Sequence, residues 1–287
     1  MTATNPMPVA SVRVAGGSLR HQVRAAAVVW QREMIRFGHD RSRIVSSLIQ
    51  PVLFLFVLGS GLSSLIPSHG DVDFRTFLFP GVLATSVLFT AAFSGISMVW
   101  DREFGFLREM LVAPVSTTAI LTGKCLGGAT VATLQSLIIL ALAGLVGVPY
   151  NLVMMAKLVL LLFLMAFMIC AMGLFLSARI KQVQSAMPLV QLTITPLMFL
   201  SGSLFPLSNL PGWLHVATTV NPMTYAVEPI RSTVFDHLDL TPAARATFNP
   251  GISWAGWHVP VPLQVAIVAA ACLVLLGLAV ARFARTE

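Results

Sequence analysis

The sequence predicts an all-α membrane protein with six transmembrane helices, an N-terminal cytoplasmic interfacial amphipathic helix and a re-entrant helical hairpin before the last span. Of the 287 residues, 56% are hydrophobic and only 10% are charged, whereas roughly 25% are charged in a soluble domain. Several uncharged stretches reach the length of about 18 residues that indicates a membrane helix. A long apolar run interrupted by prolines precedes the last of them.

Residues 1–43 are predicted to form a cytoplasmic N-terminal segment with an amphipathic helix. Its apolar side chains recur at helical spacing, with most arginines on the other side. They are Leu19, Val23, Ala26, Trp30, Met34 and Phe37. Helices of this kind lie at the membrane surface. Glu33 and Arg36 fall toward the apolar side, where their spacing would allow an ion pair between them.

Residues 44–287 are predicted to form the transmembrane domain. The expected spans are 44–66, 76–100, a stretch within 119–148, 158–178, a fifth that begins near 183, and 259–281. Each has the roughly 20 residues that a helix needs to cross the hydrocarbon core. Lys124 lies near the start of the third span, where its long side chain could reach the interface. Cys125, Cys170 and Cys272 each lie alone in an apolar tract, which is typical of buried thiols.

Basic residues predict the orientation of these spans, because cytoplasmic loops are enriched in Lys and Arg. An even number of spans puts both termini on one side, which holds fourteen basic residues against four on the other. Both termini are therefore expected in the cytoplasm. The net charge of +7 reflects this topology, so we do not expect nucleic-acid binding. Arginine outnumbers lysine fifteen to three, which suggests a GC-rich bacterial genome and a multi-pass protein of the bacterial plasma membrane.

The loop after the second span, "WDREFGFLREMLVAPVS", is sharply amphipathic. Asp101 is a suitable N-cap, Phe104, Leu107 and Leu111 follow at helical spacing, and Pro114 would end the helix. The remaining surface is charged through Arg102, Glu103, Arg108 and Glu109. The sequence therefore predicts a cytoplasmic helix over about 101–113 that is joined to two spans. An ordinary solvated loop helix is the alternative.

From Gln182 to Val227, 46 residues pass without a charged side chain, about twice what one crossing requires. Pro206, Pro211 and Pro222 prevent a single straight helix. Irregular backbone at membrane depth is tolerated only inside protein or beside a water-filled cavity. We therefore expect a helical hairpin over about 206–230 that dips into the outer leaflet, with an apolar external loop as the alternative.

Two motifs resemble those of the ABC transporter type-2 permease family, especially its daunorubicin-exporter and multidrug-resistance branch. The first is "DREFGFLREMLVAPVSTTAILTGKCLGG", from Asp101 onward. The second is "NPMTYAVEPIR", which contains Asn221, Pro222, Tyr225, Glu228 and Arg231 and precedes the final span. The resemblance covers the whole chain in order. It implies the transmembrane permease subunit of an ATP-driven exporter.

This chain is not expected to bind ATP. A phosphate-binding loop needs the pattern G-x-x-x-x-G-K-[ST], and Gly123-Lys124 is followed by Cys125 and enters a membrane span. The resemblance therefore implies a separate ABC ATP-binding subunit, two copies of which hold ATP and Mg beneath two permease chains, identical or homologous. The charged helix would then be the coupling helix, through Asp101, Arg102, Glu103, Phe104, Leu107, Arg108 and Glu109.

The transported molecule is expected to be a hydrophobic drug or a lipid, with a cell-surface glycan or glycolipid as the alternative. Mid-span acids that would indicate a proton relay are absent from the sequence. Seven residues are candidates to line the pathway between two permease chains: Phe89, Phe93, Gln135, Gln191, Thr195, Met198 and Phe199. Helix packing is an alternative role for each of them.

The sequence also allows two other classes of protein. An intramembrane serine hydrolase would use Ser201 or Ser203 with His215 or His258, although no third orienting group is visible. An assembly subunit of a multi-component exporter is the other. No cofactor or metal is expected on this chain.

Overall fold

The structure, a computed structural model, describes residues 18–63, 74–106, 115–207, 210–238, 241, 248–254 and 256–285. It is all-helical apart from one short hairpin. The helices are α1 Leu19–His39, α2 Arg41–Leu53, the π-helical η1 Phe54–Leu58, α3 Gly59–Ser63, α4 Phe74–Gly95, α5 Ser97–Glu103, α7 Thr117–Leu140, the 3-10 helix η2 Ala143–Val146, α8 Leu152–Ser177, α9 Val183–Phe199, α10 Gly212–Val220, α11 Pro222–Phe235 and α13 Val261–Phe283. Strands β1 Ser253–Trp254 and β2 Trp257–His258 form an antiparallel pair.

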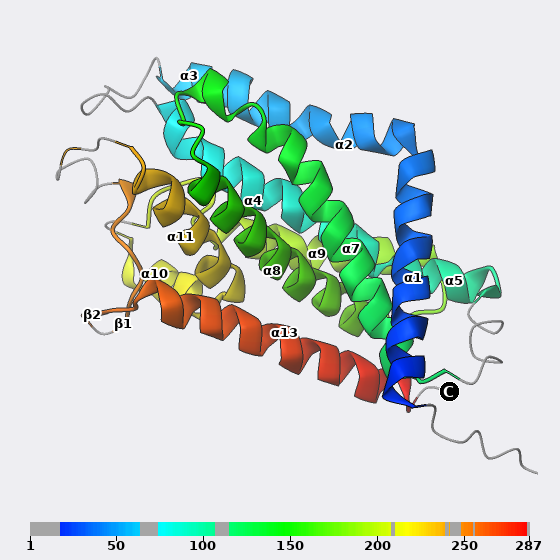
Figure 1. The fold of residues 1–287 in the computed structure, drawn as a ribbon. Helices are drawn as coiled ribbons and strands as arrows, with labels where there is room; N and C mark the ends of the chain where they lie inside the picture. The colour runs from blue at the N-terminus through cyan, green and yellow to red at the C-terminus, as the bar shows by residue number, and fades with distance from the viewer. Residues whose placement is uncertain are drawn as a thin grey trace, which may run out of the picture.

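Long apolar helices make up the body of the molecule (Figure 1). Helix α8 packs against α4, α7 and α13, and the residues at these contacts form the larger buried core. Helix α1 instead lies across one end of the bundle, the same end that holds α5 and the last turn of α13. The hairpin and α11 lie at the other end.

Among the described residues, five helical segments are long and apolar enough to cross a membrane: Ile44–Gly61, Phe74–Glu103, Thr117–Leu140, Leu152–Ser177 and Val261–Phe283. The expected fifth span corresponds to α9, which has 17 residues and contains Pro188 and Pro196. At 1.5 Å per residue α9 is about 26 Å long, less than the roughly 30 Å of a hydrocarbon core. The prediction of membrane helices is therefore confirmed for five of the six spans.

The second span is longer than the sequence suggests. Helix α4 continues, through a one-residue break at Ile96, into α5, so the helical segment ends at Glu103 rather than near residue 100. Asp101 therefore lies in the last turn of this segment, and the prediction that it caps the start of a new helix is wrong. The chain leaves the helix at Gly105, whose φ of +82° favours glycine.

Helix α1 matches the predicted N-terminal helix, but its contact face differs from the predicted stripe. It packs on α7, where Gly123 and Gly127 let the two backbones approach. A Cβ on Gly123 would lie 2.6 Å from the Ala26 carbonyl oxygen. Leu19 and Val23, which belong to the predicted stripe, remain exposed. The apolar residues of α1 thus divide between α7 and the molecular surface.

Residues 206–230 contain two consecutive helices, α10 and α11, which meet at Asn221. Within this predicted hairpin, residues 208–209 lie outside the described part. Pro222 takes the first position of α11, where its missing N–H costs nothing. Helix α11 packs against α13, α8 and α4, so this apolar segment is part of the bundle rather than a detached loop.

Candidate functional site

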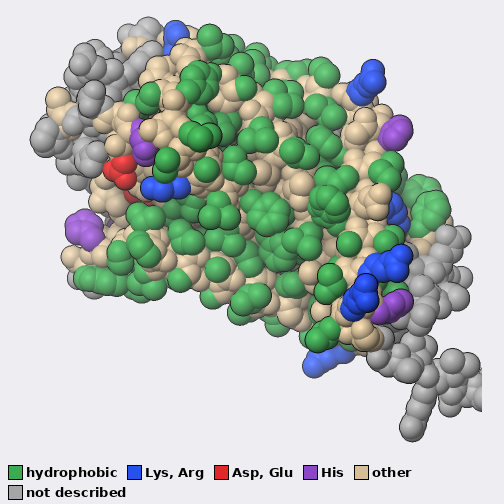
Figure 2. Space-filling view, in the orientation of Figure 1, with side chains coloured by type: hydrophobic (Ala, Val, Ile, Leu, Met, Phe, Trp, Pro, Cys, Tyr) green, Lys and Arg blue, Asp and Glu red, His purple; other side chains and the backbone are tan. Residues whose placement is uncertain are grey.

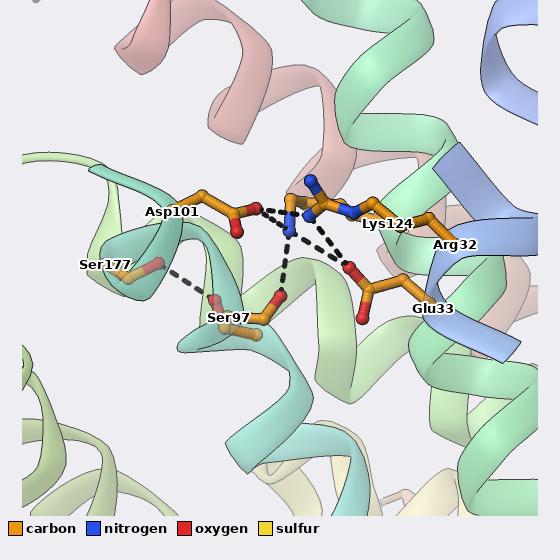
Figure 3. Close-up of polar contacts among 7 residues, drawn as sticks. Arg32, Glu33, Ser97, Asp101, Lys124 and Ser177 are labelled. Carbon is orange, nitrogen blue, oxygen red and sulfur yellow. Dashed lines mark hydrogen bonds and ion pairs between the residues drawn. The ribbon is translucent and has the colours of Figure 1, made fainter. Parts of the chain in front are cut away.

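Two charges of the first motif, Asp101 and Lys124, lie inside the protein. Asp101 is only 4% exposed, and its Oδ2 lies 2.5 Å from Lys124 Nζ on α7 and 2.7 Å from Arg32 Nη2 on α1. Lys124 Nζ also lies 3.2 Å from Glu33 Oε1 and donates to Ser97 Oγ at 3.1 Å. Figure 3 shows the cationic groups of Arg32 and Lys124 between the carboxylates of Asp101 and Glu33. This cluster joins three helices by paired charges.

The cluster gives Lys124 and Glu33 partners that the sequence did not predict. The Lys124 side chain is 1% exposed and is neutralised by Asp101 and Glu33. Glu33 pairs with Lys124 and, at 3.4 Å, with Arg32, rather than with Arg36 as its spacing suggested. Burial alone would lower the pKa of Arg32, but the carboxylates of Asp101 and Glu33 raise it, so this guanidinium stays charged.

The next two charges of the motif reach three further segments. Arg102 Nη1 donates to the carbonyl oxygens of Ala178 at 2.9 Å and Ile180 at 2.8 Å, after the end of α8. Its guanidinium carbon lies 5.0 Å from the ring centre of Phe283, at the end of α13. Glu103 Oε2 accepts a 2.7 Å bond from Val183 N, the first residue of α9, and so satisfies a donor that the helix start leaves unpaired.

The residues just after this triplet are exposed. Phe104 is 62% exposed and Phe106 is 53% exposed, and the ring of Phe104 stacks on Trp100 at 5.5 Å between centroids. The remaining predicted coupling residues, Leu107, Arg108 and Glu109, lie outside the described residues. The triplet Asp101–Glu103 therefore fixes the base of the loop, whereas the aromatic residues after it face outward.

The second motif holds the corner between α10 and α11. Asn221 caps α11 by accepting from Met223 N at 3.0 Å, and its Nδ2 donates to the Leu197 carbonyl oxygen on α9 at 2.9 Å. Tyr225 Oη donates to the Thr219 carbonyl oxygen and accepts from Trp254 Nε1, both at 2.7 Å. These bonds tie α9, α10, α11 and the β1–β2 hairpin together.

Glu228 and Arg231 form the buried end of the same motif. The residues are 4% and 0% exposed, and Arg231 Nη1 lies 4.0 Å from Glu228 Oε2. Arg231 also donates to the Gly202 carbonyl oxygen, and its guanidinium carbon lies 4.8 Å from the ring centre of Phe77 on α4. Arg231 therefore lies inside the fold, not on an external surface.

A groove of about 480 Å³ opens between α1, α2, α4 and α7, with Met187 of α9 at its edge. Three of the predicted pathway residues, Phe89, Phe93 and Gln135, line it. Gln135 also bridges helices, because it accepts from Thr90 on α4 at 3.2 Å and donates to Ser47 on α2. Gln135 thus lines the groove and also forms hydrogen bonds between helices, the two roles that the sequence left open.

The other four predicted pathway residues lie elsewhere, along α9. Gln191 and Thr195 hydrogen-bond to each other at 3.1 Å. Met198 is buried in the core, whereas Phe199 is 51% exposed. The structure does not bring these residues together with Phe89 and Phe93 in one cavity.

The geometry of Ser201 and Ser203 does not suit a hydrolase. Both hydroxyls lie within hydrogen-bonding distance of the Met198 carbonyl oxygen, at 2.7 Å and 3.1 Å, and the two hydroxyl oxygens are 3.0 Å apart. No histidine bonds to either serine in the described part of the chain, and no group of His, Cys, Asp and Glu there could hold a metal ion.

Comparison with known proteins decides the family. The family profile described as "ABC-2 type transporter" matches residues 24–235, which include both motifs and every helix from α2 to α11. The chain belongs to the ABC-2 type transporter family. It is accordingly a multi-pass permease subunit without catalytic activity of its own, as the two motifs predicted. Membership also implies an ATP-binding partner.

This permease resembles several curated proteins. It is 29% identical over 226 residues to nodulation protein J of Rhizobium leguminosarum bv. trifolii, covering 77% of this chain and 84% of the relative. It is 27% identical over 211 residues to the putative transport permease ycf38 of Cyanophora paradoxa, covering 71% and 72%. It is 29% identical over 160 residues to the probable multidrug ABC transporter permease YbhR of Escherichia coli, covering 54% and 42%.

Proposed function

We propose that this chain is the permease subunit of an ATP-driven exporter in a bacterial plasma membrane, moving hydrophobic drug-like or lipid molecules outward. Its energy would come from a separate ATPase, two copies of which hold ATP and Mg beneath two permease chains. The observation that carries the proposal is the set of contacts made by the triplet Asp101–Glu103, at the base of the connection between α5 and α7. Asp101, Arg102 and Glu103 bind it to α1, α7, α9, α13 and the segment after α8.

Such a base is suited to transmitting force. A push on the loop would act on all of these segments at once, because charge-assisted hydrogen bonds are short and directional. Phe104 and Phe106 are the outward-facing apolar residues that could insert into a partner surface. Leu107, Arg108 and Glu109 would extend the contact, with charges that set its register. Asp101, by contrast, would position the loop without touching the ATPase.

The proposed orientation places the α1 end in the cytoplasm. Arg20, Arg24, Arg36 and Arg41 are exposed there, and Figure 2 shows Lys and Arg gathered at this end of a largely hydrophobic surface. At the opposite end Trp213, Trp254 and Trp257 are exposed, as expected where a protein meets a membrane interface. Both features support cytoplasmic termini and a re-entrant α10–α11 hairpin in the outer leaflet.

A second permease chain, identical or homologous, would cover α9. The exposed side of α9 carries Gln184, Ser185 and Gln191, and amide groups are costly to expose to hydrocarbon. A facing protein surface would offer them hydrogen bonds, as helix interfaces in membranes do. With a neighbour beside it, α9 could also serve as the sixth span despite its length.

Co-purification tests the coupling proposal. A candidate ATP-binding subunit, encoded beside the permease, is expressed with the native chain or with the Phe104→Asp/Phe106→Asp variant. Because a charge in an apolar pocket costs several kcal/mol, we expect the variant to lose the ATPase while keeping its thermal unfolding temperature. Trp213→Asp, an exposed aromatic at the other end, is the matched control and should retain the ATPase. Retention by the double variant as well would contradict the proposed contact.

A further inference from the structure

Helix α1 lies where the chain enters the membrane. Only Asp40 separates it from α2, and the first segment that is long and apolar enough to cross a membrane begins at Ile44. Figure 1 shows α1, in blue, lying across the end of the bundle rather than along it. A helix in this position lies at the level of the lipid head groups, because the hydrocarbon core begins with the span that follows it.

An exposed apolar stripe runs along one side of α1. Leu19 is 86% exposed, Val23 68% and Trp30 38%, and at 100° per residue the three fall within about 40° of arc. Next to this stripe, α1 packs against α7. The Trp30 indole N–H donates to Thr130 Oγ1 on α7 at 3.1 Å, which holds the ring in place. Tryptophan at the edge of such a stripe is typical of a membrane interface.

The other side of the exposed stripe is positively charged. Arg20 and Arg24 follow it around the helix and are exposed, and neither forms an ion pair within the part of the chain that the structure describes. The two carboxylates of this region do not neutralise them, because Glu33 is bound to Lys124 and Asp40 is half-buried beyond the end of α1. Helix α1 thus presents uncompensated positive charge beside an apolar surface.

The stripe and the two arginines together fit an anionic phospholipid. Basic side chains near the cytoplasmic leaflet are attracted to its anionic lipids, and each contributes roughly fivefold to binding. The aliphatic part of an arginine side chain can also lie on apolar surface while its guanidinium group reaches a phosphate. A phosphocholine head group has no net charge, so head-group charge is expected to set the preference.

Other side chains of α1 hold the connection between α5 and α7. Gln22 Oε1 accepts from Ser116 N at 3.1 Å and from Ser116 Oγ at 2.5 Å, just before α7 begins. Arg32 donates to Asp101 on α5 at 2.7 Å. Helix α1 therefore contacts residues on both sides of the connection, and Gln22 lies in the same turn as the two exposed arginines.

We propose that α1 is a docking surface for anionic phospholipids of the inner leaflet, and that the bound lipid fixes the connection between α5 and α7. Arg20 and Arg24 would bind the head group, and the exposed stripe would pack against the upper part of the acyl chains. Lipid held there would limit the movement of α1 and, through it, of both ends of the connection. That α1 faces the inner leaflet, and that the connection meets an ATPase, rest on the proposed function.

Quenching of tryptophan fluorescence tests the docking surface on the full chain in neutral detergent micelles. The probes are phosphatidylglycerol and phosphatidylcholine with identical brominated acyl chains. The signal of Trp30 is the difference between the native chain and Trp30→Phe. We expect Trp30 to be quenched at a much lower mole fraction of phosphatidylglycerol, because only this lipid carries net negative charge. Equal quenching by the two lipids, or quenching by neither, would overturn the proposal.

Arginine variants locate the head group. Arg20→Gln combined with Arg24→Gln should weaken quenching by phosphatidylglycerol about 25-fold, fivefold for each charge removed, and leave phosphatidylcholine unchanged. Arg179→Gln combined with Arg285→Gln is the matched control, because both arginines are exposed outside α1 and the change in net charge is the same. Equal effects of the two double variants would show a response to net charge alone and contradict a site on α1.

Hydrogen exchange tests the link from α1 to the connection. In lipid nanodiscs the Ser116 backbone N–H, which donates to Gln22, should exchange several-fold more slowly with phosphatidylglycerol than with phosphatidylcholine. Gln22→Ala should abolish this difference and keep the quenching by phosphatidylglycerol, whereas the Arg20→Gln/Arg24→Gln variant should lose both. Exchange at Ser116 that does not depend on the lipid would contradict the link.

The proposed lipid contact and the proposed coupling contact fail separately. Quenching and hydrogen exchange are measured without an ATPase, so a failed co-purification would leave the docking surface on α1 standing. Conversely, equal quenching by the two lipids would refute the docking surface and leave the contact with the ATPase intact.

Discussion

Lys124 carries its ammonium group at a position where the side chain is 1% exposed, on a helix otherwise suited to the membrane. Burying such a charge is costly unless it is paired and hydrogen-bonded. Here Asp101, Glu33 and Ser97 all contact Nζ. This pairing explains how an aspartate can stand in the last turn of a membrane helix. It also explains why Asp101 and Lys124, both from the first motif, belong to one cluster.

Removing one member of this cluster should be costly. Lys124→Met is expected to lower the free energy of unfolding by about 3 kcal/mol, because the buried carboxylate of Asp101 loses the ammonium group that pairs with it. Thermal unfolding in detergent measures the effect. Lys157→Met, an exposed lysine on α8, should change little, and Asp101→Asn combined with Lys124→Met should recover part of the loss. A Lys124→Met variant as stable as Lys157→Met would show that the cluster is not stabilising.

Helix α4 is held against α8 through glycine rather than through interdigitating large side chains. At their crossing, a Cβ on Gly95 would lie 2.6 Å from the Gly173 Cα and 2.8 Å from its carbonyl carbon. Small residues allow such close approach between membrane helices. The crossing lies nearly two helical turns before Asp101, and Ser177 on α8 donates to the Gly95 carbonyl oxygen at 3.2 Å. Close packing of these two helices therefore places the base of the proposed coupling loop.

Adding one methyl group at this crossing should separate the helices. Gly95→Ala is expected to destabilise the protein by about 2 kcal/mol, since backbone atoms must move to admit it. Gly277→Ala in α13 is the matched control, because a Cβ there meets nothing within 4 Å, and alanine favours a helix by about 0.5–1 kcal/mol. Unfolding temperatures of the two variants in the same detergent give the comparison. Equal temperatures would exclude a tight α4–α8 contact.

Taken as a whole, the molecule has two different ends around a hydrophobic middle (Figure 2). One end gathers α1, α5 and the last turn of α13, and the other holds α11 and the β1–β2 hairpin (Figure 1). Contacts from Asp101, Arg102 and Glu103 tie the first end, and contacts from Asn221, Tyr225 and Arg231 tie the second. Each motif therefore stabilises one end of the bundle.

Labelling of single cysteines tests how these ends face the membrane. In a chain whose three native cysteines are replaced by alanine, Trp257→Cys should react with a membrane-impermeant maleimide on intact spheroplasts. Arg24→Cys should react only after permeabilisation, because positive charge favours the cytoplasmic side. Both positions are exposed, so accessibility alone does not separate them. The reverse pattern would invert the proposed orientation.

The class of protein, the family and five of the membrane helices could be predicted from the amino-acid sequence. Hydropathy and helical period are local properties, and a long uncharged stretch admits few structures in lipid. The contacts of the polar residues, by contrast, depend on how the helices pack. Asp101, Lys124 and Glu33 come from three helices, and Lys124 and Glu33 are separated by 91 positions. Their contact depends on how α1, α5 and α7 pack, because pairing of buried charges is set by three-dimensional distance and not by spacing along the chain.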